Sequence, residues 1–216
     1  MSDLRVHKTK YINETKRVSF KYDGKNYFGY EGDTLASALL ANGVHLIGRS
    51  FKYHRPRGIM SCGSEEPNAI CQISDKNDLT EPNVRATELE IYDGLEAFSQ
   101  NCWPNVKFDI GGINNLISPL IPAGFYYKTF MWPKSFWKKV YEPLIRMSAG
   151  LGKSPTEPDP DIYDHKYVHY DVLVIGGGLS GIISAKIAAK NNLKTLLVDD
   201  KKLSLIHISE PTRHTR

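Results

Sequence analysis

Residues 170–181 read Tyr170-Asp171-Val172-Leu173-Val174-Ile175-Gly176-Gly177-Gly178-Leu179-Ser180-Gly181, and this stretch decides the fold of the C-terminal part of the chain. A short apolar, mostly β-branched run leads directly into the pattern G-x-G-x-x-G. An Ala- and Ile-rich run from Ile182 to Lys190 follows, and a second apolar run, Thr195 to Val198, ends at Asp199. Strand, glycine turn, helix, strand and acid is the order of a dinucleotide-binding βαβ unit.

Each residue of the glycine turn has a physical role in that interpretation. Gly176 allows a tight exit from the strand, and Gly178 leaves room for the backbone to approach a pyrophosphate. Gly181 lets the helix lie close to the strand. The N–H groups of Leu179 and Ser180, at the positive end of the helix dipole, are expected to face the phosphates.

Asp199 completes the pattern, because it lies eighteen positions after Gly181. The acid that binds the ribose hydroxyls is expected about twenty positions on. The competing interpretation is a glycine-rich turn in another kind of α/β domain.

The composition is that of an ordinary soluble globular protein, with 216 residues, 41% hydrophobic and 24% charged. Its net charge of +4 is too small to predict nucleic-acid or membrane binding. The polar N-terminus and the lack of a long apolar run argue against a secretory signal and a membrane span. Three cysteines without tight spacing predict reduced thiols and a cytoplasmic location.

The N-terminal part begins with a hairpin signal. Two runs, Lys16 to Tyr22 and Asn26 to Tyr30, flank the turn dipeptide Asp23-Gly24. A helix is expected from about Thr34 to Asn42. Its predicted N-cap is Asp33, its C-terminal glycine is Gly43, and its apolar face is Leu35, Ala38 and Leu39. Hairpin followed by short helix is typical of a β-grasp, as in plant-type ferredoxins.

The region after this helix contains the most basic stretch of the chain, Gly48 to Gly58. We interpret it as a structural or interface loop rather than a nucleic-acid site. Plant-type ferredoxins carry C-x4-C-x2-C here and a fourth Cys beyond. This chain has only Cys62, Cys71 and Cys102, so we predict no iron–sulfur cluster. The histidines, including His165 and His169, show no metal-ligand spacing, and no metal site is predicted.

The remainder divides into a strand, an arm and a linker. Pro82-Asn83 and Ala86 to Tyr92 predict a further strand, and Asp93-Gly94 a turn. From about Gln100 to Gly152 the pattern is irregular and aromatic, which predicts an arm that packs onto other domains or subunits. The fold class is therefore α/β with α+β. The predicted segments are a β-grasp ferredoxin-like domain lacking cluster cysteines (16–95), an irregular arm and Pro-rich linker (96–162), a truncated Rossmann-type βαβ unit (168–202) and a non-native tail (203–216).

The chain resembles the N-terminal part of sarcosine oxidase alpha subunits from about Val18 to Asp199. The residues that carry this resemblance are Gly32 to Gly43, Gly48 to Gly58, Glu65 to Ala69, Ser99 to Asn101, Ala123 to Pro133, Tyr141 to Pro143 and Ala149 to Gly152.

The resemblance implies part of a cytoplasmic heterotetramer with beta, gamma and delta subunits. Such an enzyme oxidises sarcosine to glycine with oxygen and passes the carbon unit to tetrahydrofolate. It also implies FAD on the beta subunit, FMN between alpha and beta, and NAD on the glycine motif. The NAD contacts would be Gly176, Gly178, Leu179, Ser180, Gly181 and Asp199, and no catalytic residue would fall within this chain. The alternatives are a subunit of a related amine, opine or glycine dehydrogenase, or a non-catalytic β-grasp adaptor.

The last residues differ in character from the rest of the chain. Leu203 to Arg213 resembles the conceptual translation of a sequencing adapter. We therefore expect a non-native tail and a truncated nucleotide domain. Such a chain would bind NAD poorly or not at all, because further parallel strands are needed to cover the two predicted here.

Overall fold

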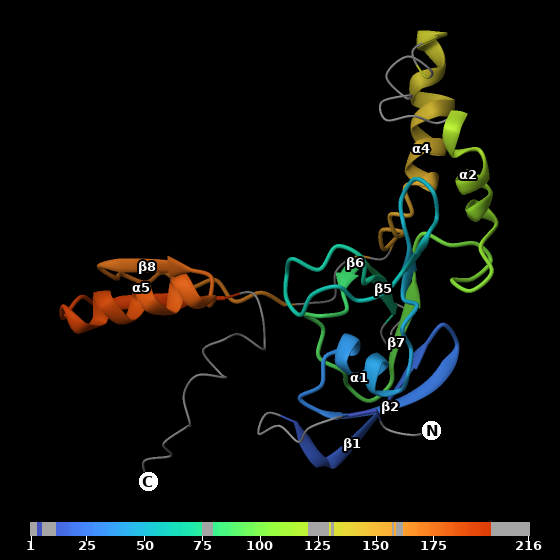
Figure 1. Cartoon of the computed structure of the whole chain (residues 1–216). Coiled ribbons are helices and arrows are strands. Elements are labelled where there is room, and N and C mark those ends of the chain that lie inside the picture. Colours follow the sequence, from blue (N-terminus) through green and yellow to red (C-terminus); the bar gives the residue numbers. More distant parts are fainter. Residues whose placement is uncertain are drawn as a thin grey trace. The chain divides into compact units, whose positions relative to one another are not determined.

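The structure is a computed structural model that describes residues 4–5, 12–74, 80–120, 130, 132–156, 158 and 162–199. The chain divides into two compact units, Met1–Pro158 and Asp159–Arg216 (Figure 1). The predicted foreign tail lies outside the described residues.

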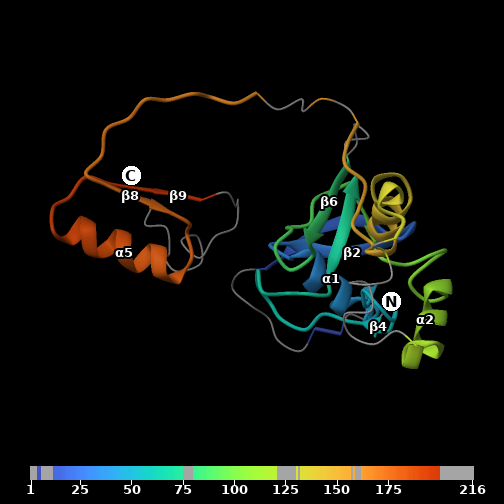
Figure 2. The same cartoon turned by 90° about the horizontal axis from the view of Figure 1, so that it is seen from above.

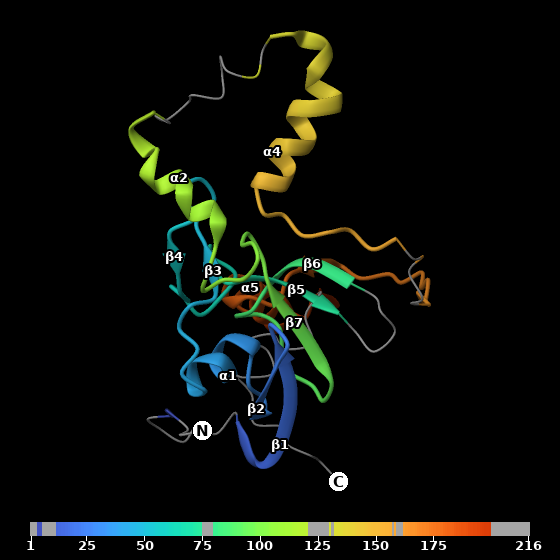
Figure 3. The same ribbon diagram turned by 90° about the vertical axis from the view of Figure 1, so that its right-hand side faces the viewer.

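A mixed five-stranded sheet in the order β2-β1-β7-β5-β6 forms the first unit. Strand β1 pairs antiparallel with β2 and parallel with β7, and β5 pairs antiparallel with both β7 and β6. Helix α1 lies against one face of the sheet (Figure 3). The β1–β2 hairpin, helix α1, and strand β7 lying parallel beside β1 make a β-grasp, as predicted. The bounds are β1 (Asn13–Tyr22), β2 (Lys25–Glu31), α1 (Leu35–Ala41), β5 (Ile70–Ser74), β6 (Thr80–Arg85) and β7 (Leu95–Ser99).

The predicted β1–β2 hairpin is confirmed at its turn. Asp23 and Gly24 have φ of 47° and 74°, the left-handed conformation that a two-residue hairpin turn needs at both positions. Asp23 also accepts hydrogen bonds from the Ser99 N–H (2.8 Å) and hydroxyl (3.0 Å), so the turn is tied to β7.

Helix α1 confirms the predicted apolar face, since Leu35, Ala38 and Leu39 are fully buried. The predicted N-cap was wrong. Thr34 is the cap, and its hydroxyl accepts from the Ser37 N–H at 3.2 Å. Asp33, the residue before this cap, is instead fully buried, and its carboxylate pairs with Arg5. It also accepts from the Tyr30 N–H (2.9 Å) and the Ser37 hydroxyl (2.7 Å).

The strand predicted over 86–92 was wrong, although the turn at Asp93-Gly94 is present. The strand that completes the sheet is β7. The backbone of residues 86–91 lies over the start of α1, where Leu89 O accepts from the Leu35 N–H and Ala86 O from the Ala36 N–H, both at 2.8 Å. These bonds satisfy helix N–H groups that have no partner inside the helix.

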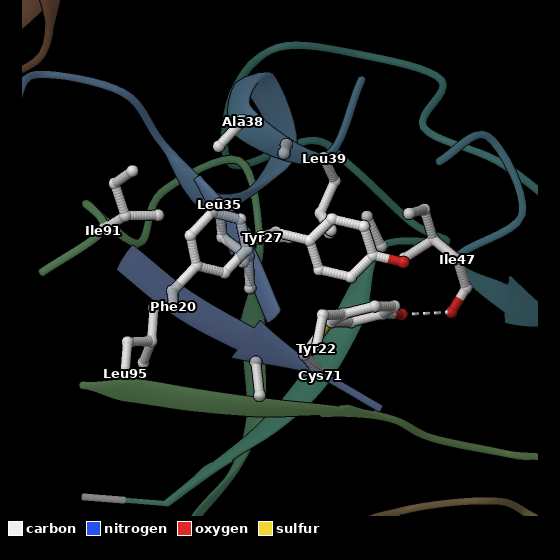
Figure 4. Close-up of a cluster of buried hydrophobic side chains, with 14 of the residues drawn as sticks. Phe20, Tyr22, Tyr27, Leu35, Ala38, Leu39, Ile47, Cys71, Ile91 and Leu95 are labelled. Carbon is white, nitrogen blue, oxygen red and sulfur yellow. Dashed lines mark hydrogen bonds between the residues drawn. The ribbon is translucent and has the colours of Figure 1, made fainter. Parts of the chain in front are cut away.

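The core lies between α1 and the sheet (Figure 4). The Tyr22 side chain lies within this core, and its hydroxyl donates to Ile47 O at 3.0 Å. Burial raises the pKa of the Tyr22 hydroxyl, which keeps it a neutral donor. Cys71 lies in the same core and behaves as a small apolar residue.

The basic stretch forms a small hairpin of β3 (Gly48–Arg49) and β4 (Pro56–Arg57). Arg49 donates from Nε to Val106 O (2.7 Å) and from Nη2 to Lys107 O (2.9 Å). His54 Nδ1 lies 2.7 Å from the buried carboxylate of Asp109. The stretch is therefore a structural loop that holds residues 106–109 in place, in agreement with the interpretation as a structural or interface loop.

In the described part of the predicted arm, short helical turns cover residues 110–120 and 134–148. Large aromatic side chains on it are exposed, from 48% at Phe136 to 82% at Trp132. Residues 152–153 lie against the sheet, with the Lys153 N–H donating to Gln72 Oε1 at 3.1 Å. The elements are η1 (Ile110–Gly112), α2 (Ile113–Leu116), η2 (Ser118–Leu120), η3 (Lys134–Phe136), η4 (Trp137–Tyr141) and α4 (Glu142–Ser148).

The second unit contains β8 (Val172–Ile175), α5 (Leu179–Lys190) and β9 (Thr195–Val198). The two strands are parallel, and α5 runs alongside them (Figure 2). A β-strand, a helix and a parallel β-strand are present in the predicted order.

Candidate nucleotide-binding site

The glycine turn and the acid lie at the same edge of the β8–β9 pair. Ile175 is the register partner of Val198, and the Gly176 N–H donates to Val198 O at 2.7 Å. Gly176 and Asp199 are the next residues of their strands. Because parallel strands end at one edge, the backbones of these two residues lie side by side there.

Gly176 and Gly178 shape the turn. Gly176 has φ of +102°, a conformation that side-chain-bearing residues rarely adopt. Gly178 is the N-cap of α5 with an extended backbone (φ −70°, ψ 175°). A Cβ added at Gly178 would have no atom within 4 Å. The space above Gly178 is thus open to a ligand, which fits the approach of a pyrophosphate.

Gly181 is required for a different reason. A Cβ at this position would overlap the carbonyl oxygen of Gly176, and it would lie 3.1 Å from the carbonyl carbon and 3.4 Å from Val174 Cγ1. The helix therefore approaches the end of β8 so closely that only glycine fits.

The N-terminus of α5 is open. Its first helical hydrogen bond runs from the Ile182 N–H to Gly178 O at 2.9 Å, and no side chain caps the helix at Gly178. The N–H groups of Leu179, Ser180 and Gly181 precede that bond and are directed out of the helix end, an arrangement that suits an anion. The corresponding groups of α1 are used by protein acceptors.

Within the described residues of this unit, large apolar side chains of β8 and α5 are exposed. None of the α5 residues is buried, and the exposed large apolar side chains of β8 and α5 range from 48% exposed at Ile183 to 80% exposed at Ile175. A sheet of two strands is marginal unless further strands or helices cover it.

The three thiols of the chain do not make a cluster site. A [2Fe–2S] cluster takes four protein ligands, and the chain has three cysteines. Cys62 is exposed, whereas Cys71 is buried and burial raises the pKa of its thiol to about 12. Within the described residues no group of three or more His, Cys, Asp or Glu side chains could hold a metal ion.

Sequence reasoning missed Glu66, a buried carboxylate in the loop between β4 and β5. The signal available in the sequence was weak, because Glu65-Glu66-Pro67-Asn68 reads as a polar surface loop. In the part of the chain that the structure describes, no helix has the length and apolarity to span a membrane.

Residues 15–102 match the family model described as a 2Fe-2S iron-sulfur cluster binding domain. With the β-grasp sheet, this match defines the class of the first unit as a ferredoxin-like β-grasp domain. A solved structure, L-proline dehydrogenase from P. horikoshii, is 20% identical with a TM-score of 0.44, covering 90% of this chain and 25% of that one.

Over 94% of its length the chain is homologous to sarcosine oxidase alpha subunits, which confirms the resemblance. It is 53% identical over 203 residues to sarcosine oxidase subunit alpha of Rhizobium meliloti (strain 1021), covering 94% of this chain and 20% of that relative. The corresponding subunits of Corynebacterium sp. strains U-96 and P-1 are 30% and 32% identical over 88% of this chain and 15% of their own length. The chain spans about a fifth or less of the relatives it matches.

Proposed function

We propose that residues 171–199 form the start of a Rossmann-type domain that binds NAD. The open N-terminus of α5 would hold the pyrophosphate, with Gly178 leaving room for it. Asp199 would accept hydrogen bonds from the adenosine ribose, since it follows β9 beside the glycine turn. The observation that carries this proposal is the convergence of glycine turn, helix N-terminus and acid at one strand edge.

NAD binding by this unit requires further parallel strands. The exposed apolar residues of β8 and α5 would be covered by them, and the second half of the dinucleotide needs its own βαβ unit. Calorimetric titration of NAD into the 216-residue chain is expected to give weak or undetectable heat. Tight binding would contradict the need for further strands.

We propose further that the chain is part of an oxidoreductase that acts on CH–NH donors, as the alpha subunit of a sarcosine oxidase. The single observation behind this is the 53% identity over 94% of the chain to an alpha subunit from Rhizobium meliloti (strain 1021). In this proposal the enzyme is cytoplasmic and works with beta, gamma and delta subunits. It uses FAD on the beta subunit, FMN between the alpha and beta subunits, and tetrahydrofolate as a co-substrate, and amine oxidation does not occur on this chain.

The test of this activity is an oxygen-uptake assay of the complete subunit co-expressed with its partners. Sarcosine, proline and opines would be compared as substrates. Turnover of sarcosine is expected, and turnover of proline or opines without sarcosine would assign the chain to a related dehydrogenase. A complex that purifies without flavin absorbance would favour the non-catalytic adaptor.

A further inference from the structure

The loop between β4 and β5 folds around one carboxylate. Glu66 is 1% exposed. Its Oε2 accepts from the N–H groups of Met60 (2.7 Å) and Ser61 (2.6 Å). Its Oε1 accepts from those of Asn68 (2.7 Å) and Ala69 (3.1 Å). Four backbone donors from both arms of the loop therefore converge on a single anion.

This loop lies within residues 15–102, which match the family model described as a 2Fe-2S iron-sulfur cluster binding domain, and it contains Cys62. Counting C-x4-C-x2-C from Cys62 puts the second and third ligands at Pro67 and Ile70, which cannot bind iron. Converging backbone N–H groups form anion-binding hollows of the kind found at phosphate and iron–sulfur sites. In this chain the hollow is filled by Glu66, the residue just before the second ligand position.

The rest of the loop is fixed around the same centre. The Glu66 N–H donates to Gly63 O at 3.1 Å, and the Thr87 hydroxyl donates to the same carbonyl at 2.9 Å. The Ala86 N–H donates to Ala69 O at 2.8 Å. This bond connects the loop to residues 86–91, the segment that lies over the start of α1. Loss of order around Glu66 would therefore also disturb the packing of the β-grasp core.

We propose that the Glu66 carboxylate replaces an iron–sulfur cluster as the anion that organises this loop, so that the β-grasp domain is a metal-free scaffold rather than an electron carrier. The geometry carries the proposal, because each carboxylate oxygen accepts from one pair of N–H groups. A glutamine of the same shape would turn one oxygen into an NH2 group that faces two donors. At least one pair of N–H groups would then lose its acceptor in a buried site.

The test is amide hydrogen exchange, followed by NMR on the full chain. In Glu66→Gln we expect exchange to be faster by about tenfold or more at one pair of amides at least, either Met60 and Ser61 or Asn68 and Ala69, because that pair loses its hydrogen bonds to a charged group. The control is Glu65→Gln, which removes the same charge from an exposed neighbour and should change none of these rates. Unchanged rates in Glu66→Gln, or equal acceleration in both variants, would overturn the proposal.

Two further measurements keep the proposal testable if Glu66→Gln does not fold. Glu66→Asp keeps the charge but withdraws the carboxylate by one methylene group, so protection should fall at one N–H pair and persist at the other. Anaerobic reconstitution of the full chain with iron and sulfide should leave no bound iron and no visible absorbance. Retention of one cluster per chain would show that the loop still accepts metal and would overturn the proposal.

Discussion

Gly181→Ala is expected to change the stability of the β8–α5–β9 unit through two effects of opposite sign. An alanine in the helix gains up to about 1 kcal/mol of propensity over glycine. Its Cβ, however, would overlap Gly176 O and lie 3.1 Å from Gly176 C, and these backbone atoms cannot rotate away. Overpacking of this kind costs about 1–3 kcal/mol, and here the relief requires α5 to move from β8. We expect the steric effect to dominate, with a net loss of about 1–2 kcal/mol.

Hydrogen exchange by mass spectrometry on peptides from residues 172–190 of the full chain measures this loss locally. A loss of about 1.4 kcal/mol corresponds to about tenfold faster exchange of amides that open with the unit. Ser184→Ala is the matched control, because it adds an alanine at an exposed site of the same helix and should slow exchange slightly. If Gly181→Ala also slows exchange, the close approach of helix and strand is not as described.

Three other predictions concern the β-grasp unit. Asp33→Asn should cost about 3–5 kcal/mol in urea unfolding, because a buried ion pair loses one partner, whereas Glu31→Gln at an exposed pair should cost below about 1 kcal/mol. Burial raises the pKa of the Glu66 carboxyl, but its backbone hydrogen bonds outweigh this and hold the pKa below the ordinary 4.5. Its contribution to stability should therefore be complete above about pH 4.5 and be lost as the pH falls through the folded-state pKa, a loss that Glu66→Gln should abolish in acid unfolding followed by circular dichroism. In a thiol-labelling assay at pH 8, Cys62 should react in the native chain, and Cys71, with its buried thiol of pKa about 12, should react only after unfolding.

The parts of the fold that could be predicted are those set by the conformational preferences of a few neighbouring residues. Asp23-Gly24 specifies its turn through positive φ at both positions, and the glycines at 176, 178 and 181 specify the strand–helix junction. These signals need no knowledge of distant residues. The order of strand, helix and strand at the candidate site followed from them.

The missed features depend on contacts between distant segments. Asp33 is a residue type typical of an N-cap and lies next to the cap position. Its carboxylate forms a buried ion pair with Arg5, and Thr34 caps the helix. Residues 86–92 look like a strand because polar and apolar residues alternate from Glu88 to Ile91, yet the carbonyls of Ala86 and Leu89 accept from N–H groups at the N-terminus of α1. Glu66 resembles a surface residue until the loop closes around it.

The nucleotide content of the complete subunit, purified with its partners, tests the central claim most directly. Gly178→Ala and Gly112→Ala each add a methyl group with nothing within 4 Å, and neither glycine has a positive φ. Only Gly178 faces the proposed pyrophosphate. Mass spectrometry of the released nucleotide should find about one NAD per subunit in the parent and in Gly112→Ala, and little in Gly178→Ala. Equal NAD in both variants, or none in the parent, would contradict the assignment of this turn as the NAD site.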